Sequence, residues 1–267
     1  MSRIDDRFHE LKAAGRKAFI PFLTAGDPDL DFTAQALKAL DEEGATFCEI
    51  GIPYSDPIAD GPVIQASYSR ALDQKIKLDN IFAMTATIGQ EIQAPLITMV
   101  SYAIIYKRGL KQYIQDAQKS GIDGAIVPDL PVEEAGPFSA LCKEADFSLI
   151  QLITPTTPAD RVEKILATTS GFLYYVSVTG ITGERKTLPT DLADRVKRLQ
   201  EKTTLPICVG FGIHQPEHVK TVSAVADGVI VGSAFVKRVA TAKTDPTAAL
   251  TDIREYTQRM VAGLSSK

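Results

Sequence analysis

The chain has 267 residues, of which 45% are hydrophobic and 23% are charged, and its formal net charge is −4. These values are ordinary for a globular protein with a core of normal size, and α/β barrels of this length are routinely one domain. The small negative charge and the lack of a Lys- or Arg-rich block argue against nucleic acid and anionic membranes as partners. No apolar run approaches the ~18–20 residues that a membrane-spanning helix needs.

The three cysteines, Cys48, Cys142 and Cys208, are far apart and form no Cys-x-x-Cys pair. Cys48 and Cys208 fall within apolar runs, which favours small buried thiols in a reducing compartment. The charged N-terminus, MSRIDDRFHE, contains no apolar signal stretch. We therefore expect a cytoplasmic protein.

The first predicted element is a helix near the N-terminus. It has Ile4, Phe8 and Leu11 on one face. We expect it to be an extra helix that closes the bottom of a barrel.

Eight short apolar runs follow, separated by turns and by helical segments. Most are continuous rather than alternating, which is typical of strands buried on both faces in a parallel sheet. The runs are 18–24, 46–50, 95–100, 124–128, 148–154, 172–177, 205–210 and 228–232.

The segments between these runs have helical periodicity, as in DLADRVKRLQ, where Leu192, Val196 and Leu199 share one face. Eight strands alternating with helices over about 250 residues predict a (β/α)8 TIM barrel, formed by one domain over residues 1–267. An open doubly wound sheet is the alternative. It would usually carry G-x-G-x-x-G after the first strand, where this chain has TAGDPDLD.

Glu49 stands near the end of the second predicted strand, and Asp56 and Asp60 follow in a loop rich in proline and glycine. Active sites of TIM barrels lie at the C-terminal ends of the strands, so Glu49 could project into the barrel mouth. Alternatively, Glu49 points to water at a strand end. Asp56 and Asp60 could likewise be turn-forming and capping residues, with Gly61 and Pro62 beginning a helix.

Glycines cluster after the last three predicted strands, in SVTGITG, in GFGI (Gly210 and Gly212) and in VGSAFVKR (Gly232 and Ser233). Glycine lets backbone N–H groups approach a ligand, and barrel enzymes often hold phosphate with the loops after strands seven and eight. The pattern predicts a phosphate site, although each glycine alone could mark only a turn.

Other chemistry is disfavoured by what the chain lacks. The three histidines, His9, His214 and His218, have no companions at metal-ligand spacing, and no lysine lies within a predicted strand to form a Schiff base. There is also no G-x-S-x-G motif. This leaves acid–base catalysis by carboxyl groups, acting on a phosphorylated substrate, as the favoured chemistry.

Several motifs together resemble the tryptophan synthase alpha subunit family over nearly the whole length. They are IPFLTAGDPD, EIGIPYSDPIADGP (Glu49 to Pro62), VPDLPVEE, SVTGITG, VGFGI and VGSAFVKR. The resemblance implies a TIM barrel that cleaves indole-3-glycerol phosphate to indole and glyceraldehyde 3-phosphate. It also implies no metal or organic cofactor in this subunit, and a pyridoxal-phosphate beta subunit as partner in an alpha2beta2 assembly.

The resemblance assigns roles to individual residues. Glu49 and Asp60 match the catalytic carboxylic acids. The remaining matches are Gly183, Gly212, Gly232 and Ser233 for phosphate, Phe22 and Tyr174 for the indole pocket, and Thr182 for a loop that orders the site. The apolar setting of Glu49 should raise its pKa toward neutrality, whereas Asp60, in a polar loop, should stay ionised.

One stretch departs from the family. After the third strand we expect an asparagine in a tyrosine-rich motif, but the chain has VSYAIIYKRG, with Ala103 and Ile104 at about that place. The resemblance puts this asparagine near the beta subunit. A lyase that works alone therefore remains as an alternative. Two further rivals are less favoured: a partner subunit without catalysis, because Glu49 and Asp60 are both present, and another phosphate-binding barrel enzyme such as an aldolase, because no strand lysine or metal ligands are visible.

Overall fold

The structure is a computed structural model that describes residues 1–57, 60–177, 189–210 and 212–264. Its strand segments form one parallel sheet in the order β5-β4-β3-β2-β1-β9-β8-β7-β6. The segments are β1 (Ala18–Thr24), β2 (Cys48–Gly51), β3 (Leu96–Met99), β4 (Ile122–Ile126), β5 (Ser148–Ile150), β6 (Leu152–Ile153), β7 (Leu173–Val176), β8 (Ile207–Gly210) and β9 (Gly228–Val231).

The sheet closes at Gln151, which separates β5 from β6 within the single strand predicted for 148–154. β5 pairs with β4, and β6 pairs with β7. The Gln151 carbonyl accepts a hydrogen bond of 3.1 Å from the Tyr174 N–H, and its side-chain amide donates to the Thr168 hydroxyl. β5 and β6 thus act as one strand that joins both ends of the sheet, and the predicted barrel is confirmed.

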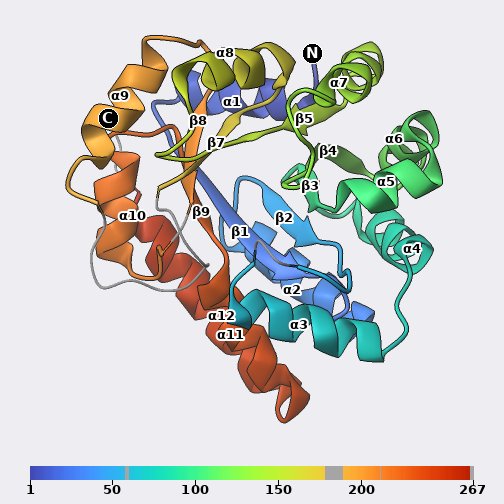
Figure 1. Ribbon diagram of the computed structural model, residues 1–267. Helices are drawn as coiled ribbons and strands as arrows, with labels where there is room; N and C mark the ends of the chain where they lie inside the picture. Colours follow the sequence, from blue (N-terminus) through green and yellow to red (C-terminus); the bar gives the residue numbers. More distant parts are fainter. Residues whose placement is uncertain (58–59, 178–188, 211, 265–267) are drawn as a thin grey trace.

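Helices surround the barrel, as Figure 1 shows. They are α1 (Arg3–Ala13), α2 (Leu30–Glu42), α3 (Pro62–Asp73), α4 (Leu78–Ile88), α5 (Tyr102–Arg108), α6 (Leu110–Lys119), α7 (Ala135–Glu144), α8 (Ala159–Thr168), α9 (Leu192–Gln200), α10 (Pro216–Ser223), α11 (Ser233–Val239), the 3-10 helix η1 (Ala240–Lys243) and α12 (Pro246–Ala262). None of these helices is long and apolar enough to cross a membrane.

The N-terminal helix α1 closes one end of the barrel, as predicted. Ile4, Phe8 and Leu11 are its buried residues. The ring of Phe8 stacks on Phe47 with 4.7 Å between centroids, and its centroid is 5.7 Å from that of Phe172. Since Phe47 and Phe172 directly precede β2 and β7, α1 covers the end where strands begin and leaves the opposite end to the loops.

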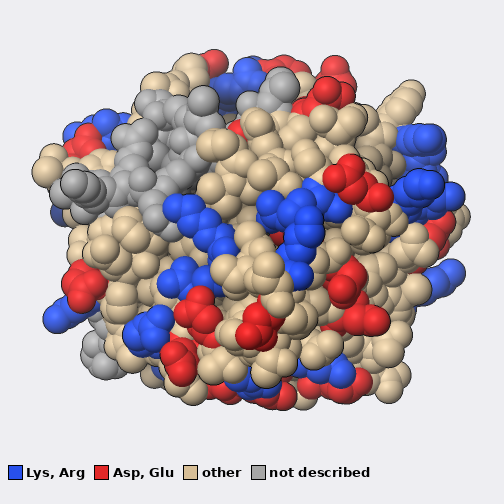
Figure 2. All heavy atoms as spheres, turned by 90° about the horizontal axis from the view of Figure 1, so that it is seen from below, with Lys and Arg blue, Asp and Glu red and all other residues tan. Residues whose placement is uncertain are grey.

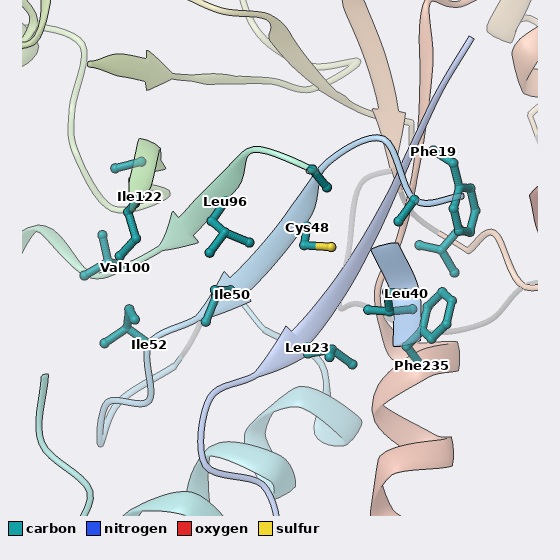
Figure 3. Close-up of a cluster of buried hydrophobic side chains, with 14 of the residues drawn as sticks. Phe19, Leu23, Leu40, Cys48, Ile50, Ile52, Leu96, Val100, Ile122 and Phe235 are labelled. Carbon is teal, nitrogen blue, oxygen red and sulfur yellow. The ribbon is translucent and has the colours of Figure 1, made fainter. Parts of the chain in front are cut away.

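Each strand divides its side chains between the barrel interior and the layer beneath the helices. On β2, Cys48 and Ile50 belong to the cluster under the helices (Figure 3), whereas Phe47, the residue before β2, belongs to the cluster that fills the barrel. Because side chains alternate along a strand, Glu49 and Gly51 share the inward side with Phe47. This register directs the Glu49 carboxyl group into the barrel.

The face in Figure 2, seen from below relative to Figure 1, carries charges of both signs. Lys and Arg side chains are intermixed there with Asp and Glu side chains of the described residues. Such intermixing is the pattern expected from 29 basic and 33 acidic residues without a block of one sign.

Candidate active site

Glu49 is buried inside the barrel, and its side chain is in an unusual state. The residue is 1% exposed, which excludes the alternative that it points to water. Neither carboxyl oxygen has a hydrogen-bond partner in the described part of the chain. Burial, and then the charge of Asp60, raises the pKa of Glu49 to about 8. At neutral pH the group is therefore mainly protonated and able to give a proton.

Asp60 precedes Gly61, the N-cap of α3, which begins at Pro62. The Asp60 N–H donates to the Pro57 carbonyl at 3.0 Å, and the Gln65 amide donates to the Asp60 carbonyl at 2.7 Å. These bonds hold the backbone and leave the carboxyl group available.

The setting of Asp60 differs from the polar loop that the sequence suggested. The residue is half-buried, and loss of solvent raises its pKa to about 6. The group is still mostly ionised at neutral pH. The pKa values of the two carboxyl groups thus lie on opposite sides of neutrality, which suits a proton donor and a charge-stabilising carboxylate in one site.

Two aromatic side chains lie beside these carboxyl groups. Phe22 on β1 is 4% exposed and stands opposite Glu49 in the strand register. Tyr174 on β7 is 8% exposed, and the charges of Glu49 and Asp60 add to burial in raising the pKa of its phenol. The barrel therefore brings Glu49, Asp60, Phe22 and Tyr174 close together, as the sequence and the family resemblance predicted.

The glycines predicted to hold phosphate lie at the same end of the barrel. Gly212 follows β8 with φ +73°, a conformation that favours glycine. Gly232 precedes α11, and a β-carbon placed on it would lie 3.9 Å from the β-carbon of Phe22. Ser233 is the first residue of α11 and is half-buried. Thr182 and Gly183 lie outside the described residues.

A groove of about 450 Å³ lies on the outside of the barrel, between the end of β2, the start of α4 and α5. Ile104, which with Ala103 stands at about the place where the family resemblance leads us to expect asparagine, is one of its lining residues, and Tyr106 on the same helix is 72% exposed. The groove is lined by Ile52, Pro53, Ile76, Lys77, Leu78, Asp79, Ile81, Ile104, Lys107 and Arg108.

Sequence reasoning missed two residues of this site, Gly51 and Tyr68. A β-carbon placed on Gly51 would lie 2.7 Å from Phe22 Cε2 and 2.9 Å from the Tyr68 oxygen, so only glycine leaves room for both side chains. The signal for Gly51 was its spacing of two residues from Glu49. Tyr68 follows Ile64 by four residues on α3, a spacing that would indicate only a core position.

Metal ligation has no support in the described residues. No group of three His, Cys, Asp or Glu side chains in these ranges could hold a metal ion. Cys48, Cys142 and Cys208 are all free and buried, as expected for Cys48 and Cys208.

A family model for the tryptophan synthase alpha chain matches residues 8–265. The chain belongs to the tryptophan synthase alpha chain family. A relative from Rhodopirellula baltica with this name is 54% identical over 245 residues, covering 91% of this chain and 88% of the relative. The tryptophan synthase alpha chain of Trichormus variabilis is 43% identical over 267 residues and is covered completely, as is this chain.

Solved structures of the family share the fold. Tryptophan synthase subunit alpha from Legionella pneumophila superposes with a TM-score of 0.92 at 34% identity, covering 99% of this chain and 98% of that one. A chain of the aminoacrylate-bound tryptophan synthase from M. tuberculosis gives a TM-score of 0.87 at 28% identity, covering 99% of this chain and 100% of that one. The barrel of this chain is therefore the barrel of tryptophan synthase alpha chains.

Proposed function

We propose that this protein is a carbon–carbon lyase that cleaves indole-3-glycerol phosphate to indole and glyceraldehyde 3-phosphate, the alpha reaction of tryptophan biosynthesis. The observation that carries the proposal is the buried, unpartnered carboxyl group of Glu49 beside Asp60, in a member of the tryptophan synthase alpha chain family. A group kept in this state in a barrel interior is a strong candidate for catalysis.

Glu49 acts first as an acid. Cleavage of the bond between indole C3 and the glycerol chain is a retro-aldol step, which requires a proton on C3. With its pKa near 8, Glu49 holds this proton at neutral pH and gives it to C3. The resulting Glu49 carboxylate then takes the proton of the side-chain hydroxyl as the carbon–carbon bond breaks, so that the group returns to its protonated state.

Asp60 acts through its charge. Protonation of C3 makes an indolenine whose ring nitrogen is positively charged. A carboxylate beside the ring N–H stabilises that charge, and the pKa of about 6 keeps Asp60 mainly ionised. Phe22 and Tyr174 form the apolar walls against which the indole ring packs.

The phosphate group belongs at the glycine end of the site, at Gly212, Gly232 and Ser233. The N–H groups of Ser233 and Ala234 come before the first hydrogen bonds of α11, which the next two residues donate to the Gly232 carbonyl at 2.9 and 3.3 Å. The Ser233 hydroxyl is beside them. The family resemblance adds Gly183 to the proposed phosphate contacts and Thr182 to the loop that orders the site.

The proposed partner is a tryptophan synthase beta subunit in an alpha2beta2 assembly. Support comes from the groove at Ile104 and from the exposed ring of Tyr106. The groove combines apolar residues with a charged rim of Lys77, Asp79, Lys107 and Arg108, and an exposed aromatic side chain on the helix that lines it is typical of a protein interface. The free thiols also agree with a reducing, cytoplasmic location, which stays a prediction.

The test is indole release from indole-3-glycerol phosphate by the purified protein, with and without the beta subunit of the same organism. We expect release by the protein alone and faster release in the complex. Release that is unaffected by the beta subunit would favour the standalone lyase. No release under either condition would contradict the proposed function.

A further inference from the structure

Tyr68 on α3 is a second buried polar side chain of the site without a partner. The residue is 1% exposed, and its hydroxyl has no hydrogen-bond partner in the described ranges. Buried phenol hydroxyls usually find a partner, because an unsatisfied buried donor destabilises the folded protein. The mechanism above gives this hydroxyl no role.

The hydroxyl reaches into the barrel next to Glu49. A β-carbon on Gly51 would lie 2.9 Å from the Tyr68 oxygen, so this oxygen occupies the space where a side chain at position 51 would begin. Gly51 and Glu49 share the inward side of β2, two residues apart, which is about 7 Å along a strand. The Tyr68 hydroxyl therefore lies on the same inward side of β2 as Glu49, but at the level of Gly51, nearer the C-terminal end of the strand.

Tyr68 also lies on the way from the carboxyl groups to the glycine end. It packs in one cluster with Phe22, Ile64 and Val236. Val236 belongs to α11, the helix that begins after Gly232, and Phe22 is adjacent to the inward space of Gly51 and to Gly232. Tyr68 thus belongs to the cluster of side chains that lies between the inward side of β2 and the start of α11.

Electrostatics keep the hydroxyl in its donor form. Burial, and then the charges of Asp60, Tyr54 and Glu49, raises the pKa of Tyr68 well above its usual value. The phenol is neutral at any working pH and has a proton to donate.

We infer that the Tyr68 hydroxyl donates a hydrogen bond to a hydroxyl group of the three-carbon chain that joins the indole and the phosphate of the substrate. The inference rests on the proposed function, because indole-3-glycerol phosphate has two hydroxyls in that chain. Tyr68 is then a specificity residue, since it recognises a hydroxylated chain rather than the ring or the phosphate.

The experiment compares wild-type protein with Tyr68→Phe, which removes only the hydroxyl. Two ligands are used: indole-3-glycerol phosphate in steady-state cleavage, and indole-3-propanol phosphate, which keeps the ring and the phosphate but lacks both chain hydroxyls, in calorimetric binding. We expect kcat/KM for the substrate to fall about 5- to 100-fold, as for a lost hydrogen bond in a buried site. The affinity for the analogue should not change, and Tm should hold or rise.

Tyr113→Phe is the matched control. Tyr113 is fully buried on α6, and its hydroxyl pairs with the Thr98 hydroxyl at 2.8 Å in the layer beneath the helices. This variant should lower Tm and leave kcat/KM unchanged.

An unchanged kcat/KM in Tyr68→Phe, or an equal loss for substrate and analogue, would overturn the inference, because the hydroxyl would then be idle or only a part of the packing. Failure of the proposed function is a separate result. In that case the wild-type protein itself would release no indole.

Discussion

The carboxyl group of Glu49 is buried, and its oxygens have no hydrogen-bond partner among the described residues. The charged form loses its hydration without gaining a hydrogen bond, so the protonated form is favoured. Asp60 is only half-buried and keeps a lower pKa. Two residues of the same chemical class thus acquire different protonation states at neutral pH from their different depths in the barrel.

The pH dependence of kcat/KM should report both groups. The reaction needs ionised Asp60 and protonated Glu49, so activity should decline below about pH 6 and above about pH 8. Steady-state cleavage over this range would measure both limbs. A profile that still rises beyond about pH 9 would contradict the role of Glu49 as the acid.

The free energy of unfolding should change with pH because of Glu49. The unfolded chain loses the Glu49 proton near 4.5, whereas the folded protein keeps it to about 8, so this group makes the folded protein less stable as pH rises between these values. Glu49→Gln removes the effect. Its free energy of unfolding should exceed that of the wild type increasingly with pH, by up to about 4 kcal/mol.

Urea unfolding at the two ends of this pH window measures the difference. Glu144→Gln, the same change at an exposed position of α7, is the control and should stay close to wild type. A Glu49→Gln difference that is constant with pH would mean that the carboxyl group titrates normally in the folded protein.

At the scale of elements, most of the fold could be predicted from the sequence. Continuous apolar runs marked the strands, and Leu192, Val196 and Leu199 are the buried residues of α9 as their spacing predicted. The interruption of one strand at Gln151 could not be predicted, because it depends on hydrogen bonds to residues distant in the sequence.

The candidate site was less accessible to sequence reasoning. Glu49 stood out because an acid is unusual in an apolar run. Tyr68 did not, because on an amphipathic helix a tyrosine indicates a core position. Its proximity to Gly51 follows from how α3 packs on β1 and β2, which no local pattern contains.

The start of α11 should be sensitive to negative charge. Gly232→Asp would put a carboxylate where the phosphate is proposed to bind, and we expect KM to rise well beyond tenfold, or about 1.4 kcal/mol, while the fold survives. Gly136→Asp on α7 is the control, since nothing lies within 4 Å of a β-carbon there. Equal KM values in both variants and the wild type would reject the phosphate site.

At the scale of the whole molecule, α1 closes one end of the barrel and the loops at the other end bear the site. Asp56 is exposed in the loop between β2 and α3, which leads from the groove to Asp60. A beta subunit docked over this face would contact the loop and change the position of Asp60. Binding of the proposed partner would thus affect the proposed reaction through the position of Asp60.

Asp56→Ala should therefore weaken activation by the beta subunit more than it lowers basal lyase activity. Titration of the variant with beta subunit, with indole release as the signal, measures both quantities. Asp160→Ala, an exposed acid on α8 outside the groove, should behave like wild type. Full activation of Asp56→Ala would remove this loop from the proposed interface.

The most direct test is single-turnover cleavage of indole-3-glycerol phosphate by Glu49→Gln with enzyme in excess. Glutamine keeps the size of the side chain but cannot give the proton to C3, whereas the proposed phosphate and indole contacts are made by other residues. We predict that substrate still binds and that the cleavage rate falls by at least ~10²–10⁴-fold. Cleavage at nearly the wild-type rate would contradict the central claim that Glu49 is the catalytic acid of a lyase.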